Sequence, residues 1–363
     1  MTDRRLRSIS GLLLLQPACF IIINLYFGME LLLHFVRFFE FVGKAYFFNT
    51  ILFPVFLLIT GAAVYRATYK QRKCIAMNRY ALGSILAGVA LLMLHYYASH
   101  IEPYQLKIRT VTYATSKISQ PLNVLHISDI QSAHVGDYEA SVFEQIKQLN
   151  PDLILHTGDL LQPKPPATWD SEFPKVAALF DQLSPPLGMY TIEGNTDDFR
   201  PCDFQNGIGP MKILYATEAI IPYDGTNIRI FGLHLRQSRH KRYDSSATRA
   251  WLDTCKADDI TILLGHMPTF MLHVSDMPID LCLAGHTHGG QIRIPAFGAL
   301  SVLCEFPRKW GRGYRKVGKT TINVSAGIGS EHAGGIPPIR IFCPPEITMI
   351  KITPAAKKES HAK

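Results

Sequence analysis

The stretch GHTHGGQ, residues 285–291, follows the short apolar run Ile279–Leu283, which is rich in residues that favour β-strands. A strand holds the backbone in place, and the loop just beyond it exposes polar side chains. We therefore expect His286 and His288 to project together from the end of a buried strand. Imidazole is a common ligand of divalent metals, so this stretch predicts a metal site at the edge of a sheet.

Similar apolar runs recur from about Gln105 onward and alternate with amphipathic or loop segments. This alternation is typical of an α/β fold. The other runs are Leu122–Ile127, Leu153–His156, Met189–Ile192, Ile228–Phe231, Ile260–Leu264 and Thr321–Val324.

Polar side chains follow five of these runs, in the motifs HISDIQ, TGDL, GNTDD, LLGHMP and AGHTHGGQ. Carboxylate, amide and imidazole groups together suit hard or borderline divalent cations. Two such ions can share one bridging carboxylate and hold a hydroxide that attacks a phosphoryl group in line; Asp159 is the expected bridge. The predicted metal ligands are Asp129, Gln131, Asp159, Asn195, His266, His286 and His288.

These motifs, in this order, resemble those of the calcineurin-like metallophosphoesterases over roughly residues 120–353. GHTHGGQ, NVSAGIG and IRIFCPPEIT are similar to the membrane-associated YkuE/YaeI-like branch of that superfamily. The resemblance implies a four-layer α/β/β/α sandwich and two divalent ions, Mn²⁺ first, with Mg²⁺, Fe²⁺ or Zn²⁺ as alternatives. It implies one ion on Asp129, Gln131, Asp159 and His288, and the other on Asp159, Asn195, His266 and His286.

Two positions depart from the family pattern. Gln131 stands where the family usually has histidine, and the manganese-dependent ADP-ribose/CDP-alcohol pyrophosphatases, which this feature resembles, also carry glutamine there. Thr196 replaces the histidine that contacts phosphate and protonates the leaving group, and threonine does not transfer that proton near neutral pH. The expected catalytic residues are Asp159, Asn195, Thr196 and His266, with Asp197, Asp198 or His234 as alternative acids and His134 as an alternative to Gln131.

The first hundred residues contain three long stretches without Asp, Glu, Lys or Arg: Gly11–Met29, Ala45–Tyr65 and Tyr80–Ile101. Each is long enough to cross a bilayer as a helix, although a cleaved signal peptide would also explain the first. We predict a membrane region at 1–104, a metallophosphoesterase domain at 105–353 and a disordered tail at 354–363. Three spans place the domain outside the cytoplasm by the distribution of Lys and Arg. A fourth span would reverse this, and so would a third span that lies in the interface instead of crossing the bilayer.

The net charge of +8 comes mainly from this hydrophobic region, because residues 1–100 carry 10 Lys and Arg and only 3 Asp and Glu. The nearly neutral remainder argues against nucleic-acid binding. Two basic segments, HLRQSRHKR at 234–242 and RKWGRGYRK at 308–316, are read as solvated loops or as a surface for anionic lipid headgroups or a diphosphate.

We therefore expect an integral membrane hydrolase, of a bacterial inner membrane, that cleaves phosphoester or phosphoanhydride bonds. Its expected partners are membrane lipids and a phosphorylated, lipid-linked substrate such as UDP-2,3-diacylglucosamine. The alternative is a membrane protein with a degenerate site that binds metal or a phosphorylated ligand without turnover. The sequence makes no prediction of the oligomeric state.

Overall fold

The computed structural model describes residues 3–33, 38–69, 74–199, 203, 206–239, 245–332 and 337–355. The chain divides into two compact units, one of residues 1–101 with 331–339 and the other of residues 102–330 with 340–363. Most of the predicted tail at 354–363 lies outside the described residues, and the domain boundaries inferred from the sequence stay predictions.

The first sheet of the larger unit has the order β1-β14-β2-β3-β4-β5. Strands β2 to β5 run parallel to one another, β14 pairs antiparallel with β2, and β1 runs parallel to β14. The sheet is therefore mixed, and its neighbouring strands β1 and β14 come from opposite ends of the unit. The strands are β1 (Lys107–Thr115), β2 (Leu122–Ile127), β3 (Leu153–His156), β4 (Met189–Thr191), β5 (Met211–Ile213) and β14 (Glu346–Pro354).

The second sheet has the order β12-β13-β9-β8-β7-β6 and is also mixed. Its four central strands are parallel, and the two edge strands are antiparallel to their neighbours. A separate two-stranded hairpin, β10 (Arg293–Ile294) and β11 (Gly298–Ala299), follows β9 in the chain. The strands of the sheet are β6 (Thr217–Tyr223), β7 (Thr226–Gly232), β8 (Ile260–Leu264), β9 (Leu281–Ala284), β12 (Gly313–Val317) and β13 (Thr320–Val324).

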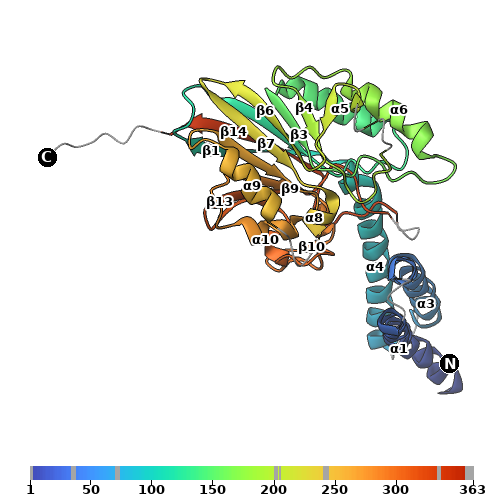
Figure 1. The fold of residues 1–363 in the computed structure, drawn as a ribbon. Helices are drawn as coiled ribbons and strands as arrows, with labels where there is room; N and C mark the ends of the chain where they lie inside the picture. The colour runs from blue at the N-terminus through green and yellow to red at the C-terminus, as the bar shows by residue number, and fades with distance from the viewer. Residues whose placement is uncertain are drawn as a thin grey trace. The chain divides into compact units, whose positions relative to one another are not determined.

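The alternation of side chains along the strands builds three apolar layers. In β2, Leu122 and Val124 point into the core between the sheets, whereas Leu125 and Ile127 pack toward α5 (Asp137–Leu149) and α6 (Trp169–Phe180). Helices α9 (Ser246–Thr254) and α10 (Met271–Val274) cover the outer face of the second sheet, and α8 (Leu235–Arg239) lies near them (Figure 1). Each fully buried Leu or Ile contributes about 1.5–3 kcal/mol. The predicted four-layer α/β/β/α sandwich is confirmed.

Local signals set the ends of the two helices beside the first sheet. Thr168 caps α6, since its side chain accepts a hydrogen bond from the backbone N–H of Ser171 at 3.2 Å. Asn150 ends α5 in the left-handed conformation, with φ of 45°. Serine and threonine are favoured at the start of a helix because their hydroxyl oxygen accepts a hydrogen bond from a free backbone N–H. Asparagine is found at the end of helices because it tolerates the left-handed conformation.

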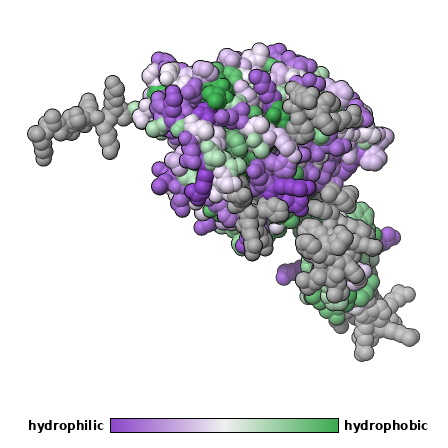
Figure 2. Space-filling model, viewed as in Figure 1, coloured by the Kyte–Doolittle hydropathy of each residue, from purple (hydrophilic) through white to green (hydrophobic). Residues whose placement is uncertain are grey.

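The smaller unit contains the three predicted apolar helices. They are α1 (Asp3–Leu33), a second helix that runs from α2 (Phe38–Phe47) through a π-helical turn into α3 (Phe53–Thr68), and α4 (Ile75–Tyr96), which continues through a second π-helical turn. The segments Gly11–Met29, Val42–Thr68 and Ile75–Tyr104 are long and apolar enough to cross a membrane. The coloured surface of these helices in Figure 2 is mostly hydrophobic.

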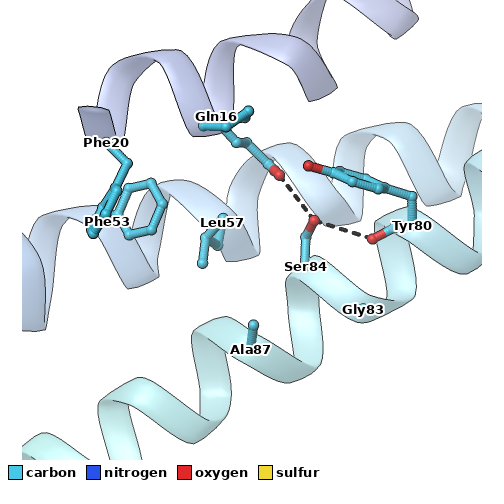
Figure 3. Close-up of a pocket in the computed structure, with 9 residues that line it drawn as sticks. Gln16, Phe20, Phe53, Leu57, Tyr80, Gly83, Ser84 and Ala87 are labelled. Carbon is cyan, nitrogen blue, oxygen red and sulfur yellow. Dashed lines mark hydrogen bonds between the residues drawn. The ribbon is translucent and has the colours of Figure 1, made fainter. Parts of the chain in front are cut away.

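Small and polar residues hold these helices together. A Cβ at Gly61 would lie 2.8 Å from the carbonyl oxygen of Ala81, so glycine permits the close packing of α3 on α4. The buried amide of Gln16 on α1 accepts a hydrogen bond from Ser84 on α4 at 2.9 Å (Figure 3). The same amide donates to Thr60 on α3. These hydrogen bonds link all three helices through one buried side chain.

Candidate metal centre

All seven predicted ligands follow the carboxyl ends of parallel strands. Those in HISDIQ, TGDL and GNTDD lie beyond the neighbouring strands β2, β3 and β4 of the first sheet, and those in LLGHMP and AGHTHGGQ lie beyond β8 and β9 of the second. Because the carboxyl ends of adjacent parallel strands meet at one edge, their loops converge there. The two packed sheets therefore bring both groups of side chains to one place.

The backbone is unusual at most of these positions. Five of the seven residues have a positive φ, which is uncommon for residues other than glycine. Such conformations are costly and cluster at functional sites, where the surrounding structure holds them. The five are Asp129 (48°), Gln131 (41°), Asp159 (60°), His286 (66°) and His288 (46°).

One half of the site is a tight cluster. Donor atoms of Asp159, His266 and His286 all lie within 4.8 Å of one another. The Nε2 atom of His266 lies 3.3 Å from Oδ2 of Asp159 and 3.0 Å from Oδ1 of Asn195. The other ring nitrogen of His266, Nδ1, lies 2.7 Å from the carbonyl oxygen of Thr157. A proton on Nδ1 satisfies that carbonyl and leaves Nε2 with a lone pair for a metal.

The other half contains Asp129 and His288, whose nearest polar atoms, Oδ1 and Nε2, are 3.8 Å apart. Both side chains are buried, yet Oδ2 of Asp129 and both ring nitrogens of His288 have no hydrogen-bond partner among the described residues. Buried polar atoms are rarely left this way. A cation between these side chains would satisfy them, so the donor set fits the divalent metals that the sequence predicts.

The ionisable groups of the site are buried close together, and this shifts their pKa values. Burial raises the pKa of Asp129 to about 7. Burial also opposes ionisation of Asp159, but the neighbouring His266 outweighs it and holds the pKa of Asp159 well below its usual range. In turn, Asp159 raises the pKa of His266 to about 9 despite the burial of the ring. Burial lowers the pKa of His286 to about 3, which keeps this ring neutral and able to bind a metal.

The two departures from the family pattern lie at the same site. Gln131 is buried, and its amide donates to Oε1 of Gln162 at 3.3 Å. The backbone N–H of Thr196 donates to Oδ1 of Asp159 at 2.8 Å, while the hydroxyl oxygen of Thr196 is buried without a partner among the described residues. Thr196 therefore positions the expected bridging carboxylate through its backbone.

The alternative residues named from the sequence lie in different surroundings. His134 is 70% exposed and lies 3.4 Å from Glu172, so its contact is with a carboxylate outside the predicted ligand set. His234 lies 4.0 Å from Glu193, and Asp198 is exposed.

Asp197 has a role that the sequence did not reveal. Its carboxylate accepts hydrogen bonds from the backbone N–H groups of Asp159 (2.9 Å), Leu160 (2.7 Å) and Gly194 (2.7 Å). It therefore ties the loop after β3 to the loop after β4. The approach is so close that a Cβ on Gly194 would lie 2.2 Å from the backbone nitrogen of Asp159. The signal available was an acid two residues after Asn195, which the sequence suggested only as a proton donor.

Comparisons with known proteins agree with this geometry. Residues 122–290 match the family described as calcineurin-like phosphoesterase. The chain is 28% identical to the uncharacterized metallophosphoesterase YkuE of Bacillus subtilis (strain 168) over 285 residues, which are 75% of this chain and 93% of YkuE. It is 32% identical to the phosphodiesterase YaeI of Escherichia coli (strain K12) over 108 residues, 28% of this chain and 38% of YaeI.

A further relative is the transmembrane protein with metallophosphoesterase domain of Danio rerio, which is 26% identical over 274 residues, 69% of this chain and 58% of that protein. The family binds divalent metals, and membership suggests metal-dependent phosphoester hydrolysis. The strand-end ligand loops, their left-handed backbone and these similarities together identify the larger unit as a calcineurin-like metallophosphoesterase domain.

Proposed function

We propose that this protein is a membrane-anchored hydrolase that uses two divalent ions to cleave phosphoester or phosphoanhydride bonds. The observation that carries this proposal is the convergence of five ligands with positive φ at the ends of strands from two sheets. Strained backbone and unsatisfied buried donor atoms both destabilise a fold. Their concentration at one edge of the sheets supports a bound cationic centre there.

The residues divide into two ligand groups around Asp159. Asp129, Gln131 and His288 would hold one ion on one side of this carboxylate, and Asn195, His266 and His286 would hold the other. When bound, the ions neutralise the phosphoryl oxygens and activate the attacking water. The chain's own contribution is to fix the ligands: Thr157 orients the ring of His266, and the backbone N–H groups of Thr196 and His286 orient Asp159 and Asp129.

The proposed substrate is a phosphoanhydride in preference to a simple monoester. Thr196 occupies the position of the family's proton donor, and its hydroxyl does not protonate an alkoxide near neutral pH. A nucleoside monophosphate expelled from a diphosphate leaves without such help. Manganese is the proposed metal because Gln131 offers an amide oxygen, a harder ligand than imidazole.

The proposed location is a membrane, with a lipid-linked substrate such as UDP-2,3-diacylglucosamine. Three helices long and apolar enough to cross a bilayer precede the domain, and a relative that is named as transmembrane carries a metallophosphoesterase domain. Anchoring would keep the site near the headgroups, where a diphosphate lipid presents its cleavable bond.

The test is Mn²⁺-dependent hydrolysis by the full-length protein in detergent. UDP-2,3-diacylglucosamine is compared with p-nitrophenyl phosphate and bis-p-nitrophenyl phosphate, for the unmodified protein, for Asp159→Ala and for Glu144→Gln as an exposed acid on α5. We expect the diphosphate lipid to be cleaved fastest, Asp159→Ala to be inactive and Glu144→Gln to be unchanged. A water-soluble nucleotide diphosphate is assayed alongside them, and its faster turnover would refute the lipid substrate.

The second candidate is a degenerate site that binds metal or a phosphorylated ligand without turnover. Gln131 and Thr196 favour it, because each replaces a histidine of the family pattern. Metal binding without hydrolysis of any of the three substrates would select this reading.

A further inference from the structure

A group of large apolar side chains is exposed just beyond the metal-ligand loop. The β10–β11 hairpin begins five residues after His288 and carries Ile294, 47% exposed, and Phe297, 58% exposed, with Leu300 exposed at its end. Phe342, 61% exposed, lies on the neighbouring segment. Single exposed apolar residues are common, but a contiguous group of them marks a surface that binds a protein, a ligand or a membrane.

Backbone hydrogen bonds show that these residues lie on neighbouring segments. The backbone N–H of Phe297 donates to the carbonyl oxygen of Ile294 at 3.1 Å across the turn, and that of Leu300 donates to Ile292 at 3.3 Å. On the other side of β10, the N–H of Arg293 donates to the carbonyl oxygen of Ile341 at 2.9 Å, which places Phe342 next to the hairpin.

Positive charge accompanies the apolar group. The guanidinium of Arg308 lies 4.7 Å from the ring centre of Phe297 and donates to the carbonyl oxygen of Leu300. Arg293, within β10, donates to the carbonyl oxygen of Gly289 at 2.8 Å, in the loop that holds His288. The hairpin is thus fixed to the candidate metal centre by a side chain as well as by the chain itself.

Further arginines add to this charge. Burial and the like charges of Arg109 and Arg293 lower the pKa of Arg315, so the three guanidinium groups act on one another. Glu346 is the carboxylate that contacts this group, 3.1 Å from Arg109 and 2.6 Å from Arg312. Two guanidinium groups on one carboxylate, with Arg315 donating to the carbonyl oxygen of Arg312 at 2.7 Å beside them, leave an excess of positive charge, which attracts anions.

The mixture of exposed apolar tips and guanidinium groups fits an anionic bilayer surface. Apolar side chains enter the boundary between headgroups and acyl chains, and arginines bind lipid phosphates. In the sequence, Arg109 on β1 follows Tyr104, the last residue of the third candidate span, by only five residues. A loop that is only solvated is not expected to combine exposed apolar side chains with guanidinium groups.

We propose that the hairpin surface, formed by Arg293, Ile294, Phe297, Leu300, Arg308 and Phe342, docks on the headgroup layer of an anionic phospholipid bilayer. Ile294 and Phe297 enter the apolar boundary, and the two arginines bind phosphates. Docking presents the metal-ligand loop to phosphoesters in the headgroup layer. This inference rests on the proposed membrane location and adds a second, peripheral contact to the apolar helices.

The test uses the full-length protein in lipid nanodiscs, with tryptophan placed at the tip of the hairpin. Phe297→Trp is compared with Ile220→Trp, because Ile220 is 53% exposed on β6, at the opposite edge of the second sheet from β12. The spectrum of the unmodified protein, which has three tryptophans, is subtracted. Discs are made of phosphatidylcholine alone, of phosphatidylcholine with phosphatidylglycerol, and of the same mixture with brominated acyl chains.

We expect the Phe297→Trp signal to shift to the blue in discs with phosphatidylglycerol, less so in phosphatidylcholine alone, and to lose much of its intensity on brominated lipid. Ile220→Trp should show neither change. An equal response at the two positions, or none at Phe297→Trp, overturns the proposal. A blue shift that grows with protein concentration in detergent would instead assign the surface to a second copy of the chain.

Recovery of the protein with the discs separates the two claims. Protein that enters discs without a lipid response at position 297 refutes docking alone. Protein that does not enter discs refutes the membrane location on which docking rests.

Discussion

Asp197→Asn perturbs the candidate metal centre without replacing a predicted ligand. In the native structure, Oδ2 of Asp197 accepts from the N–H groups of Asp159 and Gly194, and Oδ1 accepts from that of Leu160. Asparagine has one acceptor oxygen and one NH₂ group. At least one backbone N–H must therefore face a second donor, and the loops after β3 and β4 separate.

The structure sets the size of the effect. A buried donor that loses its partner costs about 1–3 kcal/mol, which lowers the melting temperature of a domain of this size by about 3–10 °C. Loss of a group that orients a ligand costs about 10–100-fold in metal affinity. Burial and the charge of Asp159 raise the pKa of Asp197 to about 7. The substitution should therefore matter most at about pH 8, where this carboxylate is ionised.

The assay is calorimetric titration of Mn²⁺ into the full-length protein at that pH, with thermal unfolding measured beside it. Asp198→Asn is the matched control, because Asp198 is the adjacent acid and is exposed. We expect weaker Mn²⁺ binding and a lower melting temperature for Asp197→Asn alone. Equal affinities and melting temperatures for the two variants would show that Asp197 does not hold the ligand loops.

Three further outcomes are expected. Mn²⁺ binding should release about two protons at about pH 6 and about one at about pH 8, because Asp129 (pKa about 7) and His266 (pKa about 9) must both lose their protons. The Mn²⁺ affinity should therefore rise with pH. Calorimetry in buffers of different ionisation enthalpy measures the number of protons released. Binding without proton release would contradict these pKa shifts. Thr196→His should speed hydrolysis of an alkyl phosphomonoester such as glycerol phosphate by about tenfold or more by restoring a proton donor for the alkoxide, with little change for a diphosphate, whose leaving group needs no proton. An unchanged ratio of these two rates speaks against a missing acid. His288→Ala should lower the metal content from two ions to one while the protein stays folded, since the ring nitrogens make no hydrogen bond to any described residue. Elemental analysis checks the metal content, and thermal unfolding checks the fold.

Much of the architecture was predictable because the polar residues of the site come directly after the strands in the sequence. Asp129, Asp159 and His266 each come within two or three residues of the end of an apolar run, so the loops that carry them could be read in order. Three charge-free stretches predicted three apolar helices, although the second candidate span begins at Val42 instead of Ala45. These signals are local, and local patterns report well on local structure.

Other features depend on contacts between distant segments. Strand β14, near the end of the chain, lies between β1 and β2, and no local pattern encodes such a pairing. Arg340 is an instructive residue, because arginine is expected at the surface. It is fully buried, and its guanidinium donates to the carbonyl oxygens of Ala326 at 2.7 Å and of Gly327 at 3.3 Å, in the loop against Asp129.

The central claim is that side chains from both sheets build one two-metal centre bridged by Asp159. The most direct measurement is the number of Mn²⁺ ions bound per chain of purified full-length protein, determined by elemental analysis after gel filtration, for the unmodified protein and for Asp159→Ala. We predict two ions for the unmodified protein and fewer than one for the variant, because the bridge serves both ions. No bound metal in the unmodified protein, or the same number in both proteins, would contradict the claim.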